Sequence, residues 1–311
     1  MNSRRHRAKL RNMLYTTLIS APELAERLED PRLAVIDCRY DLGAVAAGRA
    51  DFLAAHIPGA RYADLGADLS GPLTAGSGRH PLPEPGTLAA RFTALGLDAA
   101  NQIVAYDAGS GAFAARLWWL ARWLGHRAVA VLDGGFAAWR ALGLATQSGA
   151  EIASPPGAAP IDEAPVGTPF QAAPDDAAWL TSGAVVAALR DPRRLLVDAR
   201  APERFTGAVE PIDPVAGHVP GAVNHPFALN LGADGRFLAP DELRRRWLAR
   251  LGSRASADVI AMCGSGVTAC HNLLALEVAG LPGAKLYAGS WSEWIQESAR
   301  PVAKGMAEAP R

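Results

Sequence analysis

The stretch "VIAMCGSGVTACHNLL" (259–274) places a cysteine between an apolar run and a second apolar pattern of helical period. We therefore expect Cys263 to end a buried strand and to lie a few residues before a helix. Gly264 and Gly266 permit backbone conformations in which successive N–H groups turn towards one point. The N-terminus of the following helix adds positive potential, which favours a thiolate. The sequence thus predicts a nucleophilic cysteine.

The loop after Cys263 is predicted to form a cradle for an anion. Its backbone N–H groups would surround the sulfur and stabilise negative charge there. The residues expected to supply them are Gly264, Ser265, Gly266, Val267 and Thr268. A structural alternative is that Cys263 is a small apolar residue at the end of a buried strand. We expect that core role for Cys38 and Cys270.

The sequence does not favour metal or phosphate chemistry at this cysteine. No Cys-x-x-Cys pair occurs, and none of the seven histidines has a ligand spacing with Cys263. A cysteine phosphatase loop would end in an arginine that holds phosphate by bidentate bonds, and Ala269 stands at that place. We expect no metal and no cofactor.

The elements that must position the cysteine occur twice in the chain. Four stretches match four later stretches in the same order: 18–39 with 180–200, 54–62 with 216–224, 103–111 with 259–266, and 134–139 with 289–294. The chain therefore uses one unit twice. Asp107 stands in the first copy where Cys263 stands in the second, so only the second copy has the sulfur.

Short apolar strands alternate with helical patterns in each copy, which predicts an α/β fold. Each copy should form a roughly five-stranded, mainly parallel sheet with helices on both faces, and ligands should bind beyond the carboxyl ends of the strands. The expected segments are a basic tail (1–15), a first domain without the cysteine (16–145), an Ala/Pro/Gly-rich linker (146–177), a catalytic domain (178–303) and a C-terminal tail (304–311).

Composition limits the partners of the chain. Its 311 residues include 31 basic and 31 acidic side chains, so no bulk charge attracts nucleic acid or anionic lipid. No apolar run approaches the about 18 residues of a membrane-spanning helix. We expect neither a nucleic-acid nor a membrane partner. Three cysteines are too few for a disulfide framework, which predicts a reducing, cytoplasmic location.

These residues resemble the two-domain rhodanese-type sulfurtransferases over residues 16–303. The motifs that carry the resemblance are "CGSGVT" (263–268), "DAR" (198–200), "GHVPGA" (217–222) and "GSWSEW" (289–294). The loop is similar to the form found in 3-mercaptopyruvate sulfurtransferases, whereas thiosulfate-preferring relatives typically have basic residues directly after the cysteine.

The resemblance implies two tandem rhodanese-like domains and a sulfur-transfer reaction without a cofactor. Cys263 would attack the sulfane sulfur of a small anionic donor and hold it as a persulfide. A thiol, a thioredoxin-like protein or cyanide would then accept the sulfur. Arg204 matches the family arginine that pairs with the carboxylate of the donor, for which a planar guanidinium is well suited.

Further family positions are matched only in part. Ser265 and His80 match a serine and a histidine proposed to protonate the leaving enolate, but the family aspartate falls at or near Gly66, which leaves Asp64 and Asp68 as neighbours. Members that use mercaptopyruvate carry a second substrate arginine where this chain has Ile212. That difference keeps thiosulfate:cyanide sulfur transfer open as an alternative to mercaptopyruvate.

A noncatalytic rhodanese-like binding module is the alternative from another class, and the retained cysteine and glycines disfavour it.

Four residues that match in pairs between the two copies are assigned structural roles rather than roles in the site. Arg39 and Arg200 should form salt bridges, and His56 and His218 should belong to a turn.

Overall fold

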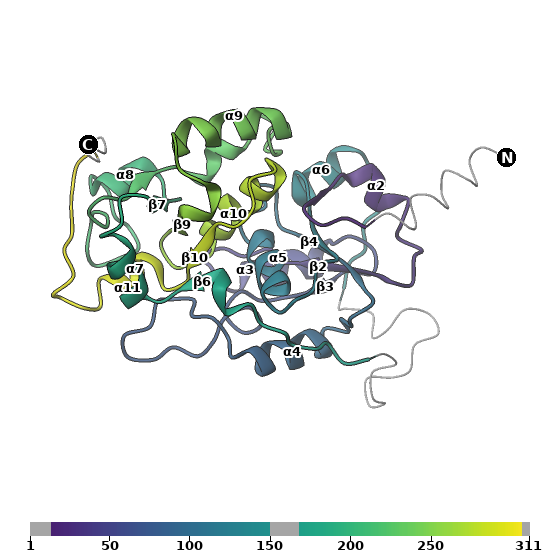
Figure 1. The fold of residues 1–311 in the computed structure, drawn as a ribbon. Coiled ribbons are helices and arrows are strands. Elements are labelled where there is room, and N and C mark those ends of the chain that lie inside the picture. Colours follow the sequence, from purple (N-terminus) through teal and green to yellow (C-terminus); the bar gives the residue numbers. More distant parts are fainter. Residues whose placement is uncertain (1–13, 150–167, 307–311) are drawn as a thin grey trace. The chain divides into compact units, whose positions relative to one another are not determined.

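The computed structural model describes residues 14–149 and 168–306. Three predicted segments extend beyond these residues: most of the basic tail, the middle of the linker and the end of the C-terminal tail. The chain forms two compact units (Figure 1). The first contains the residues up to Leu69 with Pro83–Pro174, and the second contains Ser70–Leu82 with the residues from Asp175 onwards.

The first unit is built on a five-stranded sheet in the order β1-β5-β4-β2-β3, with all neighbours parallel. Its strands are β1 (Leu18–Ile19), β2 (Leu33–Asp37), β3 (Arg61–Tyr62), β4 (Gln102–Tyr106) and β5 (Val129–Leu132). Its helices are α2 (Ala21–Ala25), α3 (Ala47–Ala54), α4 (Pro85–Ala94), α5 (Ala114–Trp123) and α6 (Gly135–Ala141).

The second unit repeats this topology in the order β6-β10-β9-β7-β8, again with parallel neighbours. Its strands are β6 (Trp179–Leu180), β7 (Leu195–Asp198), β8 (Val223–Asn224), β9 (Val259–Met262) and β10 (Lys285–Tyr287). Its helices are α7 (Ser182–Ala188), α8 (Pro202–Thr206), α9 (Pro240–Leu251), α10 (Thr268–Val278) and α11 (Ser290–Trp294), with 3-10 turns η1 (Asp176–Ala178), η2 (Phe227–Asn230) and η3 (Ser256–Asp258). The predicted pair of five-stranded α/β units is confirmed.

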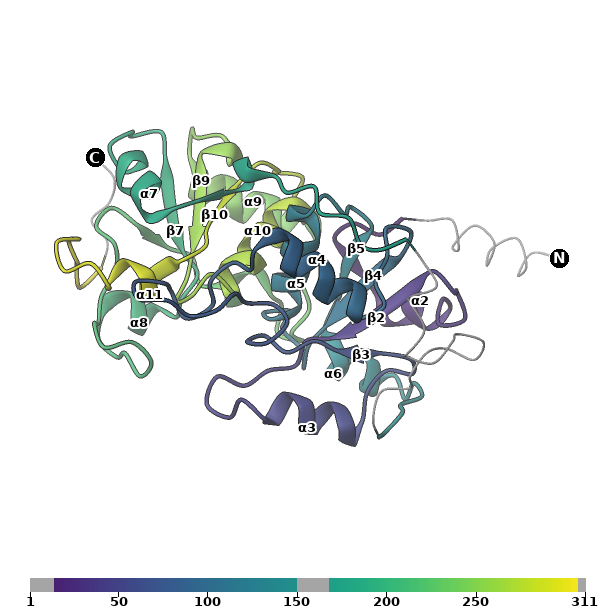
Figure 2. The same cartoon turned by 90° about the horizontal axis from the view of Figure 1, so that it is seen from below.

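Helices cover both faces of the second sheet, as predicted. Leu196 of β7 packs in a cluster with residues of α7, α8 and α11, whereas Leu195 and Val197 pack with residues of α9 and α10. Successive strand side chains point to opposite faces, so a continuous apolar run such as "LLV" serves both layers. Figure 2 shows β7, β9 and β10 between α7 on one side and α9 and α10 on the other.

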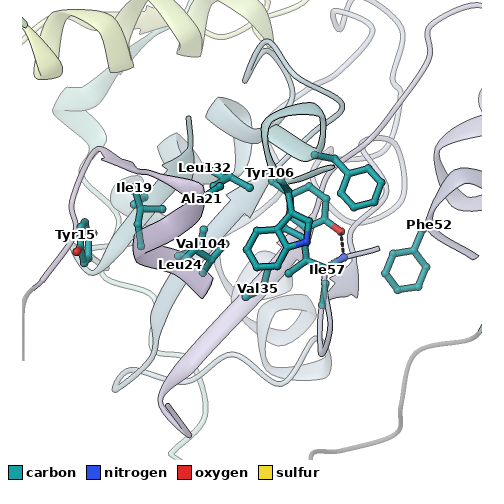
Figure 3. Close-up of a cluster of buried hydrophobic side chains, with 14 of the residues drawn as sticks. Tyr15, Ile19, Ala21, Leu24, Val35, Phe52, Ile57, Val104, Tyr106 and Leu132 are labelled. Atoms are coloured by element: carbon teal, nitrogen blue, oxygen red, sulfur yellow. Dashed lines mark hydrogen bonds between the residues drawn. The ribbon is translucent and has the colours of Figure 1, made fainter. Parts of the chain in front are cut away.

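The first unit has a core of the same kind. Figure 3 shows Val35 of β2 and Val104 of β4 beside Leu24 of α2, in a cluster that also includes Phe52 of α3. None of the helices in residues 14–149 and 168–306 is long and apolar enough to cross a membrane.

One strand is shorter than its sequence pattern indicates. The run "AVNHPF" (222–227) forms only the two-residue strand β8, and η2 follows from Phe227. Pro226 interrupts the run, and proline has no N–H to continue a ladder of hydrogen bonds. The chain therefore turns away from the sheet towards α10.

A buried polar network joins that turn to the two helices on its face of the sheet. Asn230 of η2 accepts hydrogen bonds at 3.2 Å from His225 Nε2 and from Trp247 of α9, and donates at 2.7 Å to Asn272 of α10. The His225 and Trp247 rings also lie 4.1 Å apart. This network holds α10, the helix that follows the cysteine loop.

We predict that protonation of His225 destabilises the second unit in mild acid. Burial lowers the pKa of His225 from 6.5 to about 4, although the hydrogen bond with Asn230 opposes this shift. The unfolded chain binds a proton below about pH 6.5 and the folded chain does not, so stability falls as the pH drops towards 4. The expected loss is about 3 kcal/mol.

Urea unfolding of the wild type and of His225→Gln between pH 7.5 and 4 measures this effect. The variant should be less stable at pH 7.5 and should show a shallower fall with pH. Equal slopes for the two proteins would show that His225 is not the group that titrates.

Candidate active site

The cysteine lies where the sequence predicts, directly after β9 and five residues before the first residue of α10. Its carbonyl oxygen accepts a hydrogen bond from Trp291 N–H at 3.1 Å, and the next carbonyl, of Gly264, accepts one from Ser292 N–H at 2.8 Å. A trans peptide points its C=O and the following N–H in opposite directions. The N–H groups of Gly264 and Ser265 are therefore turned away from α11.

Gly266 completes the bend of the loop. Its φ of +77° is in the left-handed region, and a Cβ there would lie 2.2 Å from the carbonyl oxygen of Ala288. Only glycine fits this position without displacing backbone. Cys270, fully buried on α10, donates from its thiol to the Gly266 carbonyl oxygen at 3.3 Å. Val267 and Thr268 lie at the start of α10, where the loop ends.

Ser290 is a residue of the site that sequence reasoning missed. Its hydroxyl accepts a hydrogen bond from Cys263 N–H at 3.1 Å and donates to the Tyr287 carbonyl at 2.9 Å. It is also the one non-glycine residue with positive φ (54°) in the described chain, a conformation that costs about 1 kcal/mol or more. Gly135 stands at the matching place in the first unit, and that difference between the copies was the available signal.

The matching loop of the first unit is occupied by its own carboxylate. Oδ1 of Asp107 accepts N–H bonds from Gly109 at 3.0 Å and Gly111 at 2.9 Å, and Oδ2 accepts them from Phe113 at 2.9 Å and Ala114 at 3.4 Å. The loop amides thus converge on a negative side chain at this position. In the first unit the loop therefore surrounds an acidic side chain of its own.

A segment from the first half of the chain completes the second site. His80, 7% exposed, lies with Nδ1 2.8 Å from Oγ of Ser265, which is 6% exposed. The preceding Arg79 donates its N–H to Ser292 Oγ at 3.0 Å. These contacts explain why residues 70–82 belong to the second unit.

Two arginines lie beside the loop. A Cβ on Gly264 would be 2.9 Å from Nη2 of Arg79 and 3.5 Å from the Nη atoms of Arg204. Arg204 is held by two acidic residues: its Nε donates to Glu210 at 3.0 Å and its Nη2 to Asp213 at 2.9 Å. Asp213 also pairs with Nη1 of Arg79. Sequence reasoning named Arg204 and passed over Arg79, although Arg79 adjoins His80.

The acids of this cluster differ in their titration. Burial opposes the charge of Glu210, but hydrogen bonds from Arg204 and from the N–H groups of Asp213 and Ile212 hold its pKa below the usual value. Burial raises the pKa of Asp213, against the effect of Arg79 and Arg204. Both acids are buried beside the loop, where they pair with Arg204, and Asp213 also pairs with Arg79.

The repeated arginines form the salt bridges predicted for them. Arg200 pairs with Asp198 at 2.7 Å and Arg39 with Asp37 at 2.6 Å. Each guanidinium lies over an aromatic ring, Trp291 in one unit and Phe136 in the other, at 4.7 and 4.5 Å from the ring centroid. These buried pairs connect the strand end to the helix that supports the loop.

The repeated histidines have a shared structural role. Nδ1 of His56 lies 2.7 Å from the Phe52 carbonyl and Nδ1 of His218 lies 2.8 Å from the Phe205 carbonyl, with each ring stacked on that phenylalanine. The same contacts recur in both units, which agrees with a structural role for the two histidines.

Several other positions singled out in the sequence are also placed. Asp64 accepts N–H bonds from Gly66 and Ala67, and Asp68 accepts one from Asp64, so both acids help to shape their own turn in the first unit. Ile212 is 40% exposed and brings no charge to the cluster. No group of three His, Cys, Asp or Glu side chains within the described residues is placed to hold a metal ion.

Comparisons with known proteins agree with this architecture. A family model described as a rhodanese-like domain matches residues 20–142 and 181–297. A probable 3-mercaptopyruvate sulfurtransferase of Pseudomonas aeruginosa is 51% identical over 290 residues, which cover 93% of this chain and 98% of that protein. A putative thiosulfate sulfurtransferase, SseB of Mycobacterium tuberculosis, is 38% identical over 294 residues, with the same shares of the two chains.

Solved structures give the same picture. The crystal structure of SseA from Escherichia coli, a 3-mercaptopyruvate sulfotransferase, superposes with a TM-score of 0.74 at 34% identity. The match covers 89% of this chain and 100% of that chain.

We predict that Asp107 stabilises the first unit by filling its own loop. Asp107→Ala should lower the free energy of unfolding by about 3 kcal/mol, because several buried amides lose a charged acceptor. Asp107→Asn should lose less, since one acceptor oxygen remains. Denaturant unfolding of each variant gives the values. Asp41→Ala is the control, because Asp41 is an exposed carboxylate that accepts the N–H of Gly43. Wild-type stability of Asp107→Ala would contradict the prediction.

Proposed function

This chain belongs to the rhodanese-like family and is a sulfurtransferase, and we propose that Cys263 carries the transferred sulfur as a persulfide. The favoured donor is 3-mercaptopyruvate, and the acceptor is a thiol, a thioredoxin-like protein or cyanide. The main observation in support is the position of Cys263 in a loop where the N–H groups of Gly264 and Ser265 are turned away from α11, with His80 in contact with Ser265. A cytoplasmic location is also proposed, because three cysteines are too few for a disulfide framework.

The first step is a displacement at sulfur. The thiolate of Cys263 attacks the sulfur of mercaptopyruvate, a sulfur–sulfur bond forms, and the carbon–sulfur bond breaks with its electron pair moving to carbon. The products are the Cys263 persulfide and the enolate of pyruvate. An acceptor thiolate or cyanide then attacks the outer sulfur and regenerates the Cys263 thiolate. Atoms and charge balance without an oxidant or reductant.

The enolate needs a proton to leave as pyruvate, and we assign its delivery to Ser265 and His80. Their contact at 2.8 Å allows the imidazolium to pass a proton through the serine hydroxyl. Both side chains are buried, which limits competing solvent. Thiosulfate would release sulfite instead, a stable anion that needs no such proton.

The persulfide anion would be stabilised by the amides of Gly264, Ser265, Gly266, Val267 and Thr268. The carboxylate of Asp107, held by four N–H groups in the repeated loop, is the model for this state. A carboxylate and a persulfide both extend negative charge beyond the first side-chain atoms, so the same ring of donors suits both.

Thiosulfate is the second candidate donor. The charges of Arg79 and Arg204 near Gly264 would suit a dianion, and the M. tuberculosis relative carries that activity in its name. A noncatalytic binding module would have no need for the contact between His80 and Ser265 or for an anion loop that lacks a carboxylate of its own.

We predict that incubation with 3-mercaptopyruvate adds one sulfur atom to Cys263 and that Cys263→Ser abolishes both this adduct and sulfur transfer to cyanide. Peptide mass spectrometry locates the adduct. Cys38→Ala is the matched control, because Cys38 is a buried cysteine of the other unit and should leave the adduct intact. Full transfer by Cys263→Ser would refute the proposed function.

We also predict that His80→Gln separates the two donors. Loss of the proton donor should lower kcat for mercaptopyruvate by about 100-fold or more. Steady-state transfer from thiosulfate to cyanide should change little, because sulfite leaves without a proton. An equal loss with both donors would mean that His80 supports the loop rather than the proton transfer.

A further inference from the structure

The arginines near the loop belong to one chain of alternating ion pairs. It runs in the order Asp198, Arg200, Glu210, Arg204, Asp213 and Arg79, and each member pairs with the next. We refer to these six residues as the ion-pair chain. It begins at the fully buried carboxylate of Asp198, directly at the end of β7, and it ends at Arg79, which is 31% exposed.

The end of the ion-pair chain differs in charge from its interior. Arg200 and Arg204 each pair with two carboxylates, whereas Arg79 pairs with one within the described residues. Arg79 is therefore the least neutralised arginine of the six residues. Its Nη2 is also closer than the Nη atoms of Arg204 to where a Cβ of Gly264 would be, at 2.9 Å against 3.5 Å.

Arg79 has hydrogen-bonding capacity to spare. A guanidinium carries five N–H donors, and in the described structure only Nη1 of Arg79 is paired, with Asp213. Its Nε is buried and has no hydrogen-bond partner. A buried donor without a partner loses the hydrogen bonds of water and gains nothing in return. The Nη2 of the same guanidinium lies beside Gly264, where an anion would meet it.

The backbone of Arg79 is also fixed in place. Its N–H donates to Ser292 of α11, the residue whose own N–H holds the Gly264 carbonyl. The backbone of Arg79 and the cysteine loop are therefore both hydrogen-bonded to the same short helix. A cation held in this way is preorganised for binding, so little side-chain freedom is lost when a ligand arrives.

We propose that Arg79 is a second donor-binding residue and that the carboxylate of the donor takes the next place in the ion-pair chain, after Arg79 and beside Arg204. The inference rests on the proposed function. It adds that the site recognises a small donor by a carboxylate next to the carbon atoms that carry the sulfur. Arg79 thus supplies, from residues 70–82, a charge that Ile212 does not.

Arg79→Gln tests the proposal with two donors, 3-mercaptopyruvate and 3-mercapto-2-oxopropanamide, in which a neutral amide replaces the carboxylate. We expect KM for the acid to rise about 10- to 100-fold, as for the loss of a charge-assisted hydrogen bond. The amide should show wild-type kcat and KM. Arg79→Lys keeps the charge but lacks the planar guanidinium. Its KM for the acid should therefore lie between those of the wild type and Arg79→Gln.

Arg193→Gln is the matched control, because Arg193 is 79% exposed and its ion pair among residues 14–149 and 168–306 is with Asp191 of the same turn. Arg193→Gln should leave kcat and KM unchanged for both donors. If Arg79 served only to hold residues 70–82 in place, Arg79→Gln would instead lower kcat equally for acid and amide through a displaced His80. That result, or a wild-type KM for the acid in both Arg79 variants, would overturn the proposal.

Calorimetric binding of pyruvate, which carries the same carboxylate, separates this proposal from the proposed function. The dissociation constant of pyruvate from Arg79→Gln should rise by a factor similar to that expected for KM. This measurement does not depend on turnover. Absence of a sulfur adduct on wild-type Cys263 would remove the proposed function. Unchanged pyruvate binding in an active Arg79→Gln protein would remove the role of Arg79 alone.

Discussion

The cysteine loop depends on two backbone hydrogen bonds, from Trp291 and Ser292 of α11 to the carbonyl oxygens of Cys263 and Gly264. These two hydrogen bonds fix two consecutive peptide planes. The N–H groups of Gly264 and Ser265, on the opposite edges of those planes, therefore point away from α11. Without them the carbonyls could turn towards the sulfur and repel a thiolate. The direction of the loop amides thus depends on backbone N–H groups of the five-residue helix α11.

The first unit has the same device. Phe136 and Ala137 of α6 donate to the carbonyls of Asp107 and Ala108 just as α11 donates to the second loop. The frame is therefore a property of the repeated fold, and the chemistry depends on the side chain placed inside it. In the first unit a carboxylate accepts hydrogen bonds from the loop amides, whereas in the second unit the thiol of Cys263 stands at that position.

Two further features distinguish the second site from the first. Ser290 accepts a strained backbone conformation and ties the Cys263 amide, where the first unit has the relaxed Gly135. Residues 70–82 bring His80 into contact with the loop serine and Arg79 into the cluster of charges beside it. The repeated unit provides the loop of backbone amides. A segment from the other half of the chain provides His80 and Arg79, which a single copy does not contain.

The two α/β units, the strand end that carries Cys263, the bend that needs Gly266 and the replacement of the cysteine by Asp107 in the first copy could all be predicted from the sequence, because they follow from local periodicity and from comparing two copies. The buried pairs of Arg39 and Arg200 were predictable for the same reason. The three-dimensional structure was needed to see that Arg204 is shared between Glu210 and Asp213, that Ser290 holds the cysteine amide and that Arg79 lies beside Gly264. Those contacts join residues far apart in the chain, and no periodicity records them.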